Sequence, residues 1–543
     1  MNGTDPKLLI LLLTVTFIGW RFFRRRTGKS ILDKIPGPPS NSFWAGNMLQ
    51  FDARDGMDFQ RHVALDYGSV TRMHGLFGQP VLYVSDPKAL QTIILKEEHI
   101  FQEPLAFRMT NNFVFGPGLL STIGETHRKQ RKLLNPAFST NHMRSILPIF
   151  YGVAHRLRDA ISTQVKNGPE EVDILNWMSR TSLELIGQGG LGYSFDPLTE
   201  NVQNEYGNAV KDLFPNLQPL SMFVPLVPLI GNIGPAWFRR SVTSLMPYRK
   251  IQRVISIVDT MNKRSSEIFN ARKEAIRQGD DASLQQVGGG KDIMSLFIKA
   301  NAATSEGDRL PDEELVAQMS TLVTGAVDTT SNALSRILYI LAGRQDVQEK
   351  LRKEILEAEA GEGLSYDELD QLPILDSICR ETLRVYPPAP TIFRQPCQDT
   401  VLPLSEPIVG TDGHLIKEIP IPKGTLFIVG IMGSNASKTL WGEDAREWKP
   451  ERWLSPLPST VTENPTPGIY SNMMTFIGGK RGCIGFKFSE MEIKVVLSAL
   501  LSTFKFHLTE KPIEWNIAAV QYPTVGKDSS VPAMLLRVEL LKS

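Results

Sequence analysis

A chain of 543 residues with 59 basic and 58 acidic side chains has a net charge of +1, which gives no reason to expect nucleic acid as a partner. Its 42% hydrophobic and 22% charged residues are ordinary for a folded protein. Cys379, Cys397 and Cys483 are odd in number and lack metal-like spacing, which argues against a disulfide framework and for a reducing compartment. No repeat divides the chain, and residues 279–291 are its only glycine-rich spacer.

The N-terminus carries an apolar run from Leu8 to Phe23, about 16 residues or about 24 Å as a helix. That is short for a membrane span, but Arg21 can snorkel and Trp20 suits the interface. A cleaved signal peptide is the alternative, yet no small-residue cleavage site follows, and residues 24–26 are all arginine. We therefore expect residues 1–26 to form a single-pass anchor in the endoplasmic reticulum membrane, with the remaining chain cytosolic.

Residues 27–40 contain Pro36-Gly37-Pro38-Pro39, whose fixed backbone would stop a helix and form a stiff hinge. Residues 41–543 would then form one body. Alternating apolar and polar residues from Ser69 to Val84 predict a small antiparallel sheet, and helical patterns dominate most of the chain that follows.

Residues 101–120 are rich in aromatic side chains but broken by Pro104, Gly116 and Pro117, which predicts a loop with apolar side chains to bury. Residues 124–132 start a basic helix on which His127 and Arg131 share a face. Arg128, Lys129 and Lys132 fit a solvated helix face as well as a partner surface.

Leu213 to Phe238 is unusually apolar and holds five prolines, which predicts irregular backbone rather than a helix. It is either a buried connection or a second membrane contact.

A helix is predicted to start at Pro311 and run to Gly343, about 45 Å. At its midpoint, residues 325–330 read Gly-Ala-Val-Asp-Thr-Thr, which is poor for helix propensity. Threonines there can bond back to the carbonyl four residues earlier and bend the helix. Local rules are broken where function requires it.

Glu381 and Arg384 lie three apart on a helix, where an exposed ion pair would contribute little. Near the C-terminus, residues 476–485 form a glycine-rich loop that delivers Cys483 directly before a predicted helix at 486–501. A helix N-terminus favours a thiolate, and a soft anionic sulfur is a suitable axial ligand for haem iron. The alternative for a single cysteine is a buried structural residue.

Together these motifs resemble the cytochrome P-450 family of haem-thiolate monooxygenases. The string from Phe476 to Gly485 matches its Phe…Gly-x-Arg-x-Cys-x-Gly loop, and residues 325–330 match its oxygen-activation motif with Ala326 in place of a glycine. Residues 124–132 and the loop 455–471 are similar to basidiomycete fungal members. The resemblance implies a mainly α fold with a small β region, in which haem b lies between the long helix and the Cys483 helix.

The resemblance also implies roles for individual residues. Cys483 would ligate iron, Thr329 would hold iron-bound oxygen, and Asp328 would relay protons. Haem contacts would come from His127, which replaces the family's usual tryptophan, and from Arg131, Arg394, Arg481, Phe476, Gly479, Gly485 and Ala326. Glu381, Arg384 and Arg452, the last within Pro450-Glu451-Arg452, would form a buried structural cluster. Phe107, Phe113, Phe115, Ile392 and Val520 would line the substrate site.

The chain has no dinucleotide fingerprint, so electrons from NADPH would come through a separate reductase, with cytochrome b5 a further candidate donor. The substrate would be an apolar small molecule, such as a terpenoid or other fungal secondary metabolite. A haem-thiolate isomerase or dehydratase, or a catalytically silent haem sensor, is the alternative. The oxygen-activation residues Asp328 and Thr329 argue against both.

Overall fold

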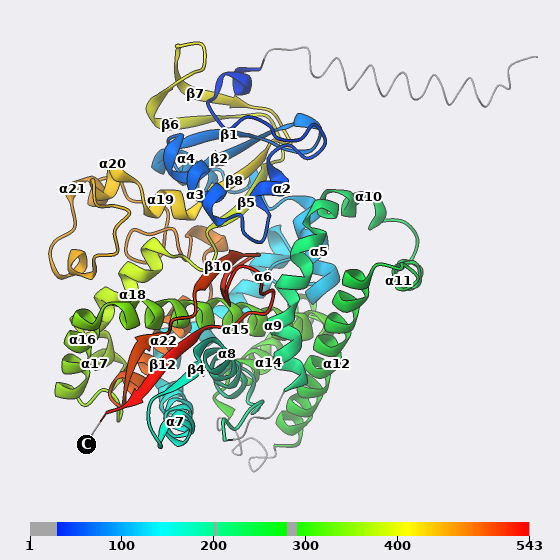
Figure 1. Ribbon diagram of the computed structural model, residues 1–543. Coiled ribbons are helices and arrows are strands. Elements are labelled where there is room, and N and C mark those ends of the chain that lie inside the picture. Colours follow the sequence, from blue (N-terminus) through cyan, green and yellow to red (C-terminus); the bar gives the residue numbers. More distant parts are fainter. Residues whose placement is uncertain (1–29, 200–203, 280–289, 542–543) are drawn as a thin grey trace, which may run out of the picture.

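The computed structural model describes residues 30–199, 204–279 and 290–541 and divides into a β-rich part and a larger helical part (Figure 1). The predicted anchor at 1–26, and the first three residues of the hinge, lie outside the described residues. Within the hinge, the Pro36 carbonyl accepts a 2.9 Å hydrogen bond from the Arg72 backbone. The Asn47 side chain bonds the Pro39 carbonyl at 2.8 Å, so this segment packs on the body.

The main sheet has the strand order β1-β2-β8-β5-β3. Its strands are β1 (Val70–His74), β2 (Pro80–Val84), β8 (Leu426–Gly430), β5 (Thr391–Pro396) and β3 (Phe101–Gln102). The β1–β2 pair is antiparallel, as predicted, and β2 pairs in parallel with β8. Three smaller sheets complete the β structure: β6 (Thr400–Val409) with β7 (Leu415–Ile421), β10 (Ile513–Ile517) with β11 (Gln521–Val525), and β4 (Glu170–Asp173), β12 (Leu535–Leu540) and β9 (Phe504–Leu508).

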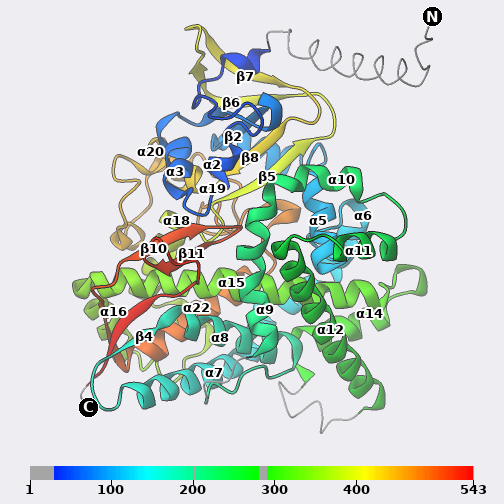
Figure 2. The same cartoon turned by 45° about the vertical axis from the view of Figure 1, so that its right-hand side comes forward.

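Helix α15 (Asp312–Gly343) crosses the helical part, as both ribbon views show (Figure 2). Its 32 residues begin after Pro311 with acidic residues in the first turn, which suits the positive end of a helix dipole. Helix α22 (Phe486–Leu501) covers the predicted range and packs against α15 and α7 (Thr140–Val165). The long predicted helix and the helix after Cys483 are therefore confirmed.

The described residues also form other α-helices, some beside this pair and some in the β-rich part. They are α2 (Met48–Phe51), α3 (Met57–Asp66), α4 (Pro87–Gln91), α5 (Leu105–Phe115), α6 (Gly124–Leu134), α8 (Ile174–Leu185), α9 (Glu205–Leu217), α10 (Val227–Ile230), α11 (Ala236–Ser244), α12 (Arg249–Gln278), α14 (Ile293–Ala303), α16 (Gln345–Glu357), α17 (Tyr366–Asp370), α18 (Pro373–Val385), α19 (Ile431–Asn435), α20 (Lys438–Trp441) and α21 (Ser459–Thr462).

The prediction of a loop over residues 101–120 was wrong, because α5 occupies its centre. Pro104 is the N-cap of this helix, and Gly116 ends it with a φ of 85°. Both positions are those where proline and glycine favour helix ends. The residues that break the pattern therefore bound the helix instead of interrupting it.

The prediction of irregular backbone from Leu213 to Phe238 was also wrong. Helix α9 continues through the 3₁₀-helix η6 (Gln218–Leu226) into α10, and α11 follows after Pro235. Pro219 and Pro228 lie in the first turns of η6 and α10, where proline is tolerated, whereas Pro215 and Pro225 lie inside α9 and η6. The run Glu205–Ile230 is long and apolar enough to span a membrane by length and composition. An 18-residue stretch within it has a mean hydropathy of 1.4, and only 6% of that stretch is buried.

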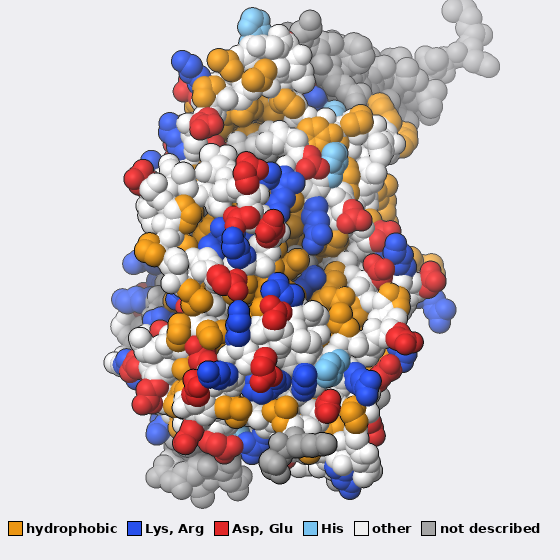
Figure 3. Space-filling view, turned by 60° about the vertical axis from the view of Figure 1, so that its left-hand side comes forward, with side chains coloured by type: hydrophobic (Ala, Val, Ile, Leu, Met, Phe, Trp, Pro, Cys, Tyr) orange, Lys and Arg blue, Asp and Glu red, His pale blue; other side chains and the backbone are white. Residues whose placement is uncertain are grey.

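Acidic and basic side chains are mixed on the surface outside this apolar run. Figure 3 shows acidic and basic side chains interspersed over one face, in keeping with a net charge of +1. Hydrophobic side chains gather at its upper end, where the β6–β7 hairpin exposes Val401, Val409 and Leu415.

Candidate functional site

The loop before α22 holds Cys483 in a tight turn. The Cys483 backbone N–H donates to the Phe476 carbonyl at 2.8 Å, and Gly485 caps α22. Gly479 has a φ of 66°, and an added Cβ there would lie 2.8 Å from the Ile94 carbonyl, so no side chain fits. The Phe476 ring packs edge-on against Tyr470 at 5.5 Å. These contacts fix the backbone that carries the cysteine.

The Cys483 thiol remains accessible although protein surrounds it. Burial raises its pKa, and the Gly485 N–H and the Arg131 charge only partly oppose that rise. Burial therefore opposes the thiolate form that the helix N-terminus favours. Coordination to a metal ion would deprotonate the thiol.

The middle of α15 opens onto free space at Gly325. This residue is exposed although most of α15 around it is buried, and an added Cβ would meet nothing within 4 Å. The Thr329 hydroxyl donates to the Gly325 carbonyl at 2.6 Å, which is the predicted bond back along the helix. The Thr330 hydroxyl lies 2.9 Å from that of Ser489 on α22 and so faces a different way.

Asp328 faces a small cavity that is also lined by Lys211 of α9, Asn332 of α15, Val520 before β11 and Tyr522 within it. The cavity has about 10 Å³ of free volume, close to the space one water molecule needs. Burial raises the pKa of Asp328 to about 7, while the charge of Lys211 lowers it. A carboxyl group with such a pKa can release and accept a proton at neutral pH.

Two predicted haem-contacting arginines share one acid. Glu103 lies 3.6 Å from Arg394 and 3.2 Å from Arg481. Burial lowers the pKa of both arginines; Glu103 and Glu98 oppose that shift in each, and Arg394 further lowers the pKa of Arg481. Two buried cations on one carboxylate leave positive charge that an anion would neutralise.

Arg131 and His127 add donors from α6. Arg131 donates to the Gly482 carbonyl at 2.5 Å and to Asn135 at 3.2 Å, and no carboxylate among the described residues pairs with it within 4 Å. Burial, with the charges of Arg481 and Arg131, lowers the pKa of His127 to about 3. His127 is therefore a neutral hydrogen-bond donor at neutral pH.

These features fit haem. The accessible Cys483 thiol lies near the positive charge of Arg131, Gly325 leaves room for a flat ligand, and Arg394 and Arg481 carry positive charge that propionates would neutralise. The chemistry of the side chains present therefore matches a dianionic iron porphyrin with a sulfur ligand.

The predicted structural cluster is assembled and buried. Arg384 forms two 2.8 Å bonds with Glu381 and also donates to the Asn435, Ala445 and Glu447 carbonyls. Arg452 Nε lies 3.6 Å from Glu381. The cluster locks α18 to the segment after α20.

The predicted substrate-lining residues lie in different settings. Val520 lines the Asp328 cavity, and Ile392 is half-buried in β5. Phe115 is part of the main core and Phe107 is half-buried, whereas Phe113 is 44% exposed. An added Cβ at Gly231 would lie 3.2 Å from Phe113, which places that ring beside α10.

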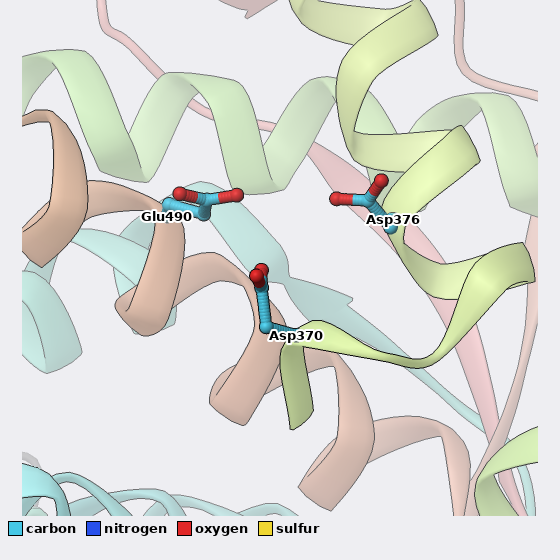
Figure 4. A group of neighbouring side chains, drawn as sticks. All are labelled: Asp370, Asp376 and Glu490. Atoms are coloured by element: carbon cyan, nitrogen blue, oxygen red, sulfur yellow. The ribbon is translucent and has the colours of Figure 1, made fainter. Parts of the chain in front are cut away.

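One group of carboxylates resembles a metal site. Asp370, Asp376 and Glu490 lie together (Figure 4). The Lys494 ammonium contacts them at 2.6, 2.9 and 3.2 Å. The lysine supplies the positive charge that a metal ion would bring, so this group is a structural ion cluster.

Glu103, Lys211 and Arg336 were not among the residues predicted from the sequence. Glu103 lies in the segment predicted as an apolar loop, and Lys211 precedes the apolar run of 213–238. Arg336 is nearly buried in α15, where its position on an otherwise apolar face was the available signal.

Comparisons with known proteins agree with this site. The chain matches the family described as Cytochrome P450 over residues 36–518. It is 60% identical to cytochrome P450 monooxygenase 81 of Postia placenta, covering 96% of this chain and 95% of that one. It is 47% identical to ganoderic acid synthetase CYP5150L8 of Ganoderma lucidum, with 98% of each chain covered.

A solved structure, that of cytochrome P450 CYP102L1, superposes with a TM-score of 0.70 at 21% identity, covering 93% of this chain and 99% of that one. That likeness shows the mainly helical fold with its small β region. The match over most of the chain, together with the high identity to basidiomycete monooxygenases, shows that this chain belongs to the cytochrome P450 family and is a P450 monooxygenase.

Proposed function

We propose that the chain oxidises an apolar small molecule with dioxygen and electrons that a separate reductase transfers from NADPH. The observation that carries the proposal is the accessible Cys483 thiol in a body where α15 opens at Gly325 and keeps both Asp328 and Thr329. The reaction consumes NADPH, a proton, dioxygen and a C–H bond, and yields NADP⁺, water and an alcohol.

Bound haem would supply dioxygen activation and oxygen transfer, with thiolate ligation favouring O–O cleavage. Cys483 would supply the thiolate that binds its iron, and Arg131, Arg394, Arg481 and His127 would hold the propionates. Phe476, Gly479, Gly485 and Ala326 would contact the ring. These residues orient the group and neutralise its charge.

Asp328 and Thr329 would deliver protons. The Asp328 carboxyl has a pKa of about 7 and faces a cavity of about one water's size beside Lys211. It can therefore take a proton from solvent and pass it inward. The Thr329 hydroxyl would release its 2.6 Å bond to the Gly325 carbonyl and become a hydrogen-bond donor toward the free space at Gly325.

The substrate class we propose is terpenoid. This rests on the relative named ganoderic acid synthetase, which is 47% identical over nearly the whole chain. The predicted lining residues are mostly aromatic or branched aliphatic side chains, which would exclude water and favour a large apolar substrate.

We place the protein at the endoplasmic reticulum membrane with its body cytosolic. The support is the apolar run Leu8 to Phe23 with its arginine flank and the exposed apolar side chains of α10 and α11. Leu229 and Trp237 are each 70% exposed, which suits a second membrane contact.

The decisive test is reconstitution with NADPH–cytochrome reductase and a terpenoid panel. We expect substrate-dependent NADPH and dioxygen consumption with one oxygen atom in the product. The carbon monoxide complex should show the long-wavelength Soret band of thiolate ligation, and Cys483→Ala should lose it. Product formation without NADPH or dioxygen would instead favour the isomerase or dehydratase, and a haem protein without turnover would favour the sensor.

A second test addresses reductase docking on a basic surface formed by Arg128, Lys129, Lys132 and Lys487. Arg128 pairs with Glu125 at 2.7 Å and Lys129 with Asp308 at 2.6 Å, so nearby acids offset part of the charge. Lys129→Glu with Lys132→Glu should raise the KM for reductase about threefold and leave substrate spectra unchanged. The matched control is Lys350→Glu with Lys353→Glu on α16. Equal KM values in both pairs would count against docking there.

A further inference from the structure

Arg336 is a buried cation that neither the haem site nor the structural cluster uses. It lies on α15, is 7% exposed, and has no carboxylate partner among the described residues. Burial drives its pKa well below the usual range, and the only other charged neighbour that shifts it, Arg61, lowers it further. An uncompensated buried charge is costly and needs other interactions to hold it.

Aromatic rings hold this guanidinium. Its carbon lies 3.1 Å from the centre of the Trp515 ring on β10 and 4.6 Å from that of Tyr386, which follows α18. Tyr339, one turn later on α15, packs edge-on against the same Trp515 ring at 6.3 Å. A planar guanidinium stacks on aromatic faces in a way that a lysine ammonium cannot.

The guanidinium also holds Gln521, the first residue of β11. Arg336 donates to the Gln521 side-chain oxygen at 3.3 Å. The Gln521 amide then donates to the Pro387 carbonyl at 3.0 Å, and its backbone N–H donates to the Pro388 carbonyl at 2.9 Å. The side-chain oxygen and the side-chain nitrogen of the buried Gln521 therefore both form hydrogen bonds, and Arg336 fixes the orientation of the side-chain amide.

These bonds join two segments beside the proposed substrate site. The turn between β10 and β11 carries Ala518 and Val520, which line the cavity at Asp328. Pro387 and Pro388 lead into β5, which carries Ile392. Since Gln521 directly follows Val520, a shift of Gln521 would move the turn and its distance from β5 together.

We propose that Arg336 is a positioning residue whose contacts with Trp515 and Gln521 set the spacing between the β10–β11 turn and the start of β5, and so the shape of the substrate site. This inference rests on the proposed monooxygenase function. It predicts that substitution of Arg336 weakens the binding of large ligands that contact both segments and leaves haem binding itself unchanged.

The test compares two ligands that coordinate haem iron. Imidazole is too small to touch both segments, whereas clotrimazole is bulky. We expect Arg336→Met and Gln521→Leu to raise the dissociation constant of clotrimazole about tenfold, and that of imidazole by less than about twofold. The double variant should bind clotrimazole no more weakly than either single variant, because both substitutions remove the same Arg336–Gln521 interaction. Arg344→Met, an exposed arginine just after α15, is the matched control.

Hydrogen exchange supplies a readout that does not depend on ligand. Amides in residues 513–525 should exchange faster in both variants and not in Arg344→Met. If Arg336→Met does not fold, Gln521→Leu, which keeps the aromatic stacking, carries the test, whereas a folded Arg336→Met that does not bind haem would contradict the proposal.

Unchanged clotrimazole binding, additive effects, or equal weakening of both ligands would overturn the positioning role. These outcomes are distinct from failure of the proposed function, which would appear in the wild type as a missing thiolate Soret band of the carbon monoxide complex.

Discussion

The Cys483 loop and the segment from α9 to α11 show two ways in which sequence determines structure. In the loop, single residues have no substitute: Gly479 would clash with the Ile94 carbonyl if it carried a side chain, and Cys483 is the only sulfur there. In the segment, the common property is exposed apolar surface spread over many side chains. A single substitution in the Cys483 loop should therefore abolish function, whereas substitutions in the segment from α9 to α11 should each reduce function only slightly.

The largest effect should come from the buried cluster that supports the haem side. Glu381 accepts bonds from Arg384 and from the Trp453 indole at 2.9 Å, so Glu381→Gln leaves Arg384 and Arg452 without their shared charge. We expect a loss of about 3–5 kcal/mol in unfolding free energy. Denaturant titration measures it, and Glu274→Gln, in an exposed pair with Arg277, should leave stability unchanged. A Glu381→Gln variant as stable as wild type would contradict the role of the cluster.

Thr329→Ala should have the next largest effect. It removes the hydroxyl proposed to donate to bound oxygen and leaves α15 intact. NADPH oxidation should continue at a comparable rate, while product per NADPH falls by between about tenfold and about 10²-fold and hydrogen peroxide accounts for the electrons. Thr330→Ala, whose hydroxyl faces Ser489, is the control. Coupling as efficient as in wild type would show that another group supplies the bond.

Most of the helical fold with its small β region could be predicted from the sequence, and the reason is physical. A long apolar period gives α15, and Gly479, whose φ is positive, helps to form the Cys483 turn. The errors came from proline and glycine. Pro104 and Gly116 bound α5, and Pro219 and Pro228 occupy first turns, so the same residues that break a helix also begin or end one.

The partners of the motif residues could not be predicted, because they come from distant positions in the chain. Glu103 meets Arg481 across 378 residues and Lys211 meets Asp328 from another helix. Pairing of this kind depends on how helices pack, which no local pattern contains. The raised pKa of the Cys483 thiol belongs to the same class, because burial is a property of the assembled body.

A smaller effect should appear in the pH dependence of stability. The pKa of Asp328 rises from 3.8 to about 7 on folding, so the folded state holds its proton more tightly across that range. The free energy of unfolding should therefore fall as pH rises from about 4 to about 7, and Asp328→Asn should lack that contribution. Lys211→Met should move the end of the fall to higher pH, because Lys211 lowers this pKa. Identical pH curves for wild type and Asp328→Asn would contradict the shift.

The smallest effects should come from substitutions of single exposed residues of α10 and α11. They test whether the contributions of these side chains to membrane binding add up. A chain lacking residues 1–26 should keep detergent-sensitive binding to phospholipid vesicles, because Leu229 and Trp237 are each 70% exposed. Leu229→Ser and Trp237→Ser should each weaken binding by about threefold to tenfold, since burying one such side chain contributes about 1.5–3 kcal/mol and only part of it enters the interface.

Leu356→Ser is the matched control, because Leu356 is 52% exposed on α16, which both ribbon views place far from α10 (Figures 1 and 2). The two substitutions together should weaken binding by the product of the single effects, because the side chains lie on different helices and act independently. Equal binding in all of these variants, or a truncated chain that stays wholly in solution, would mean that the exposed apolar surface contacts something other than the bilayer.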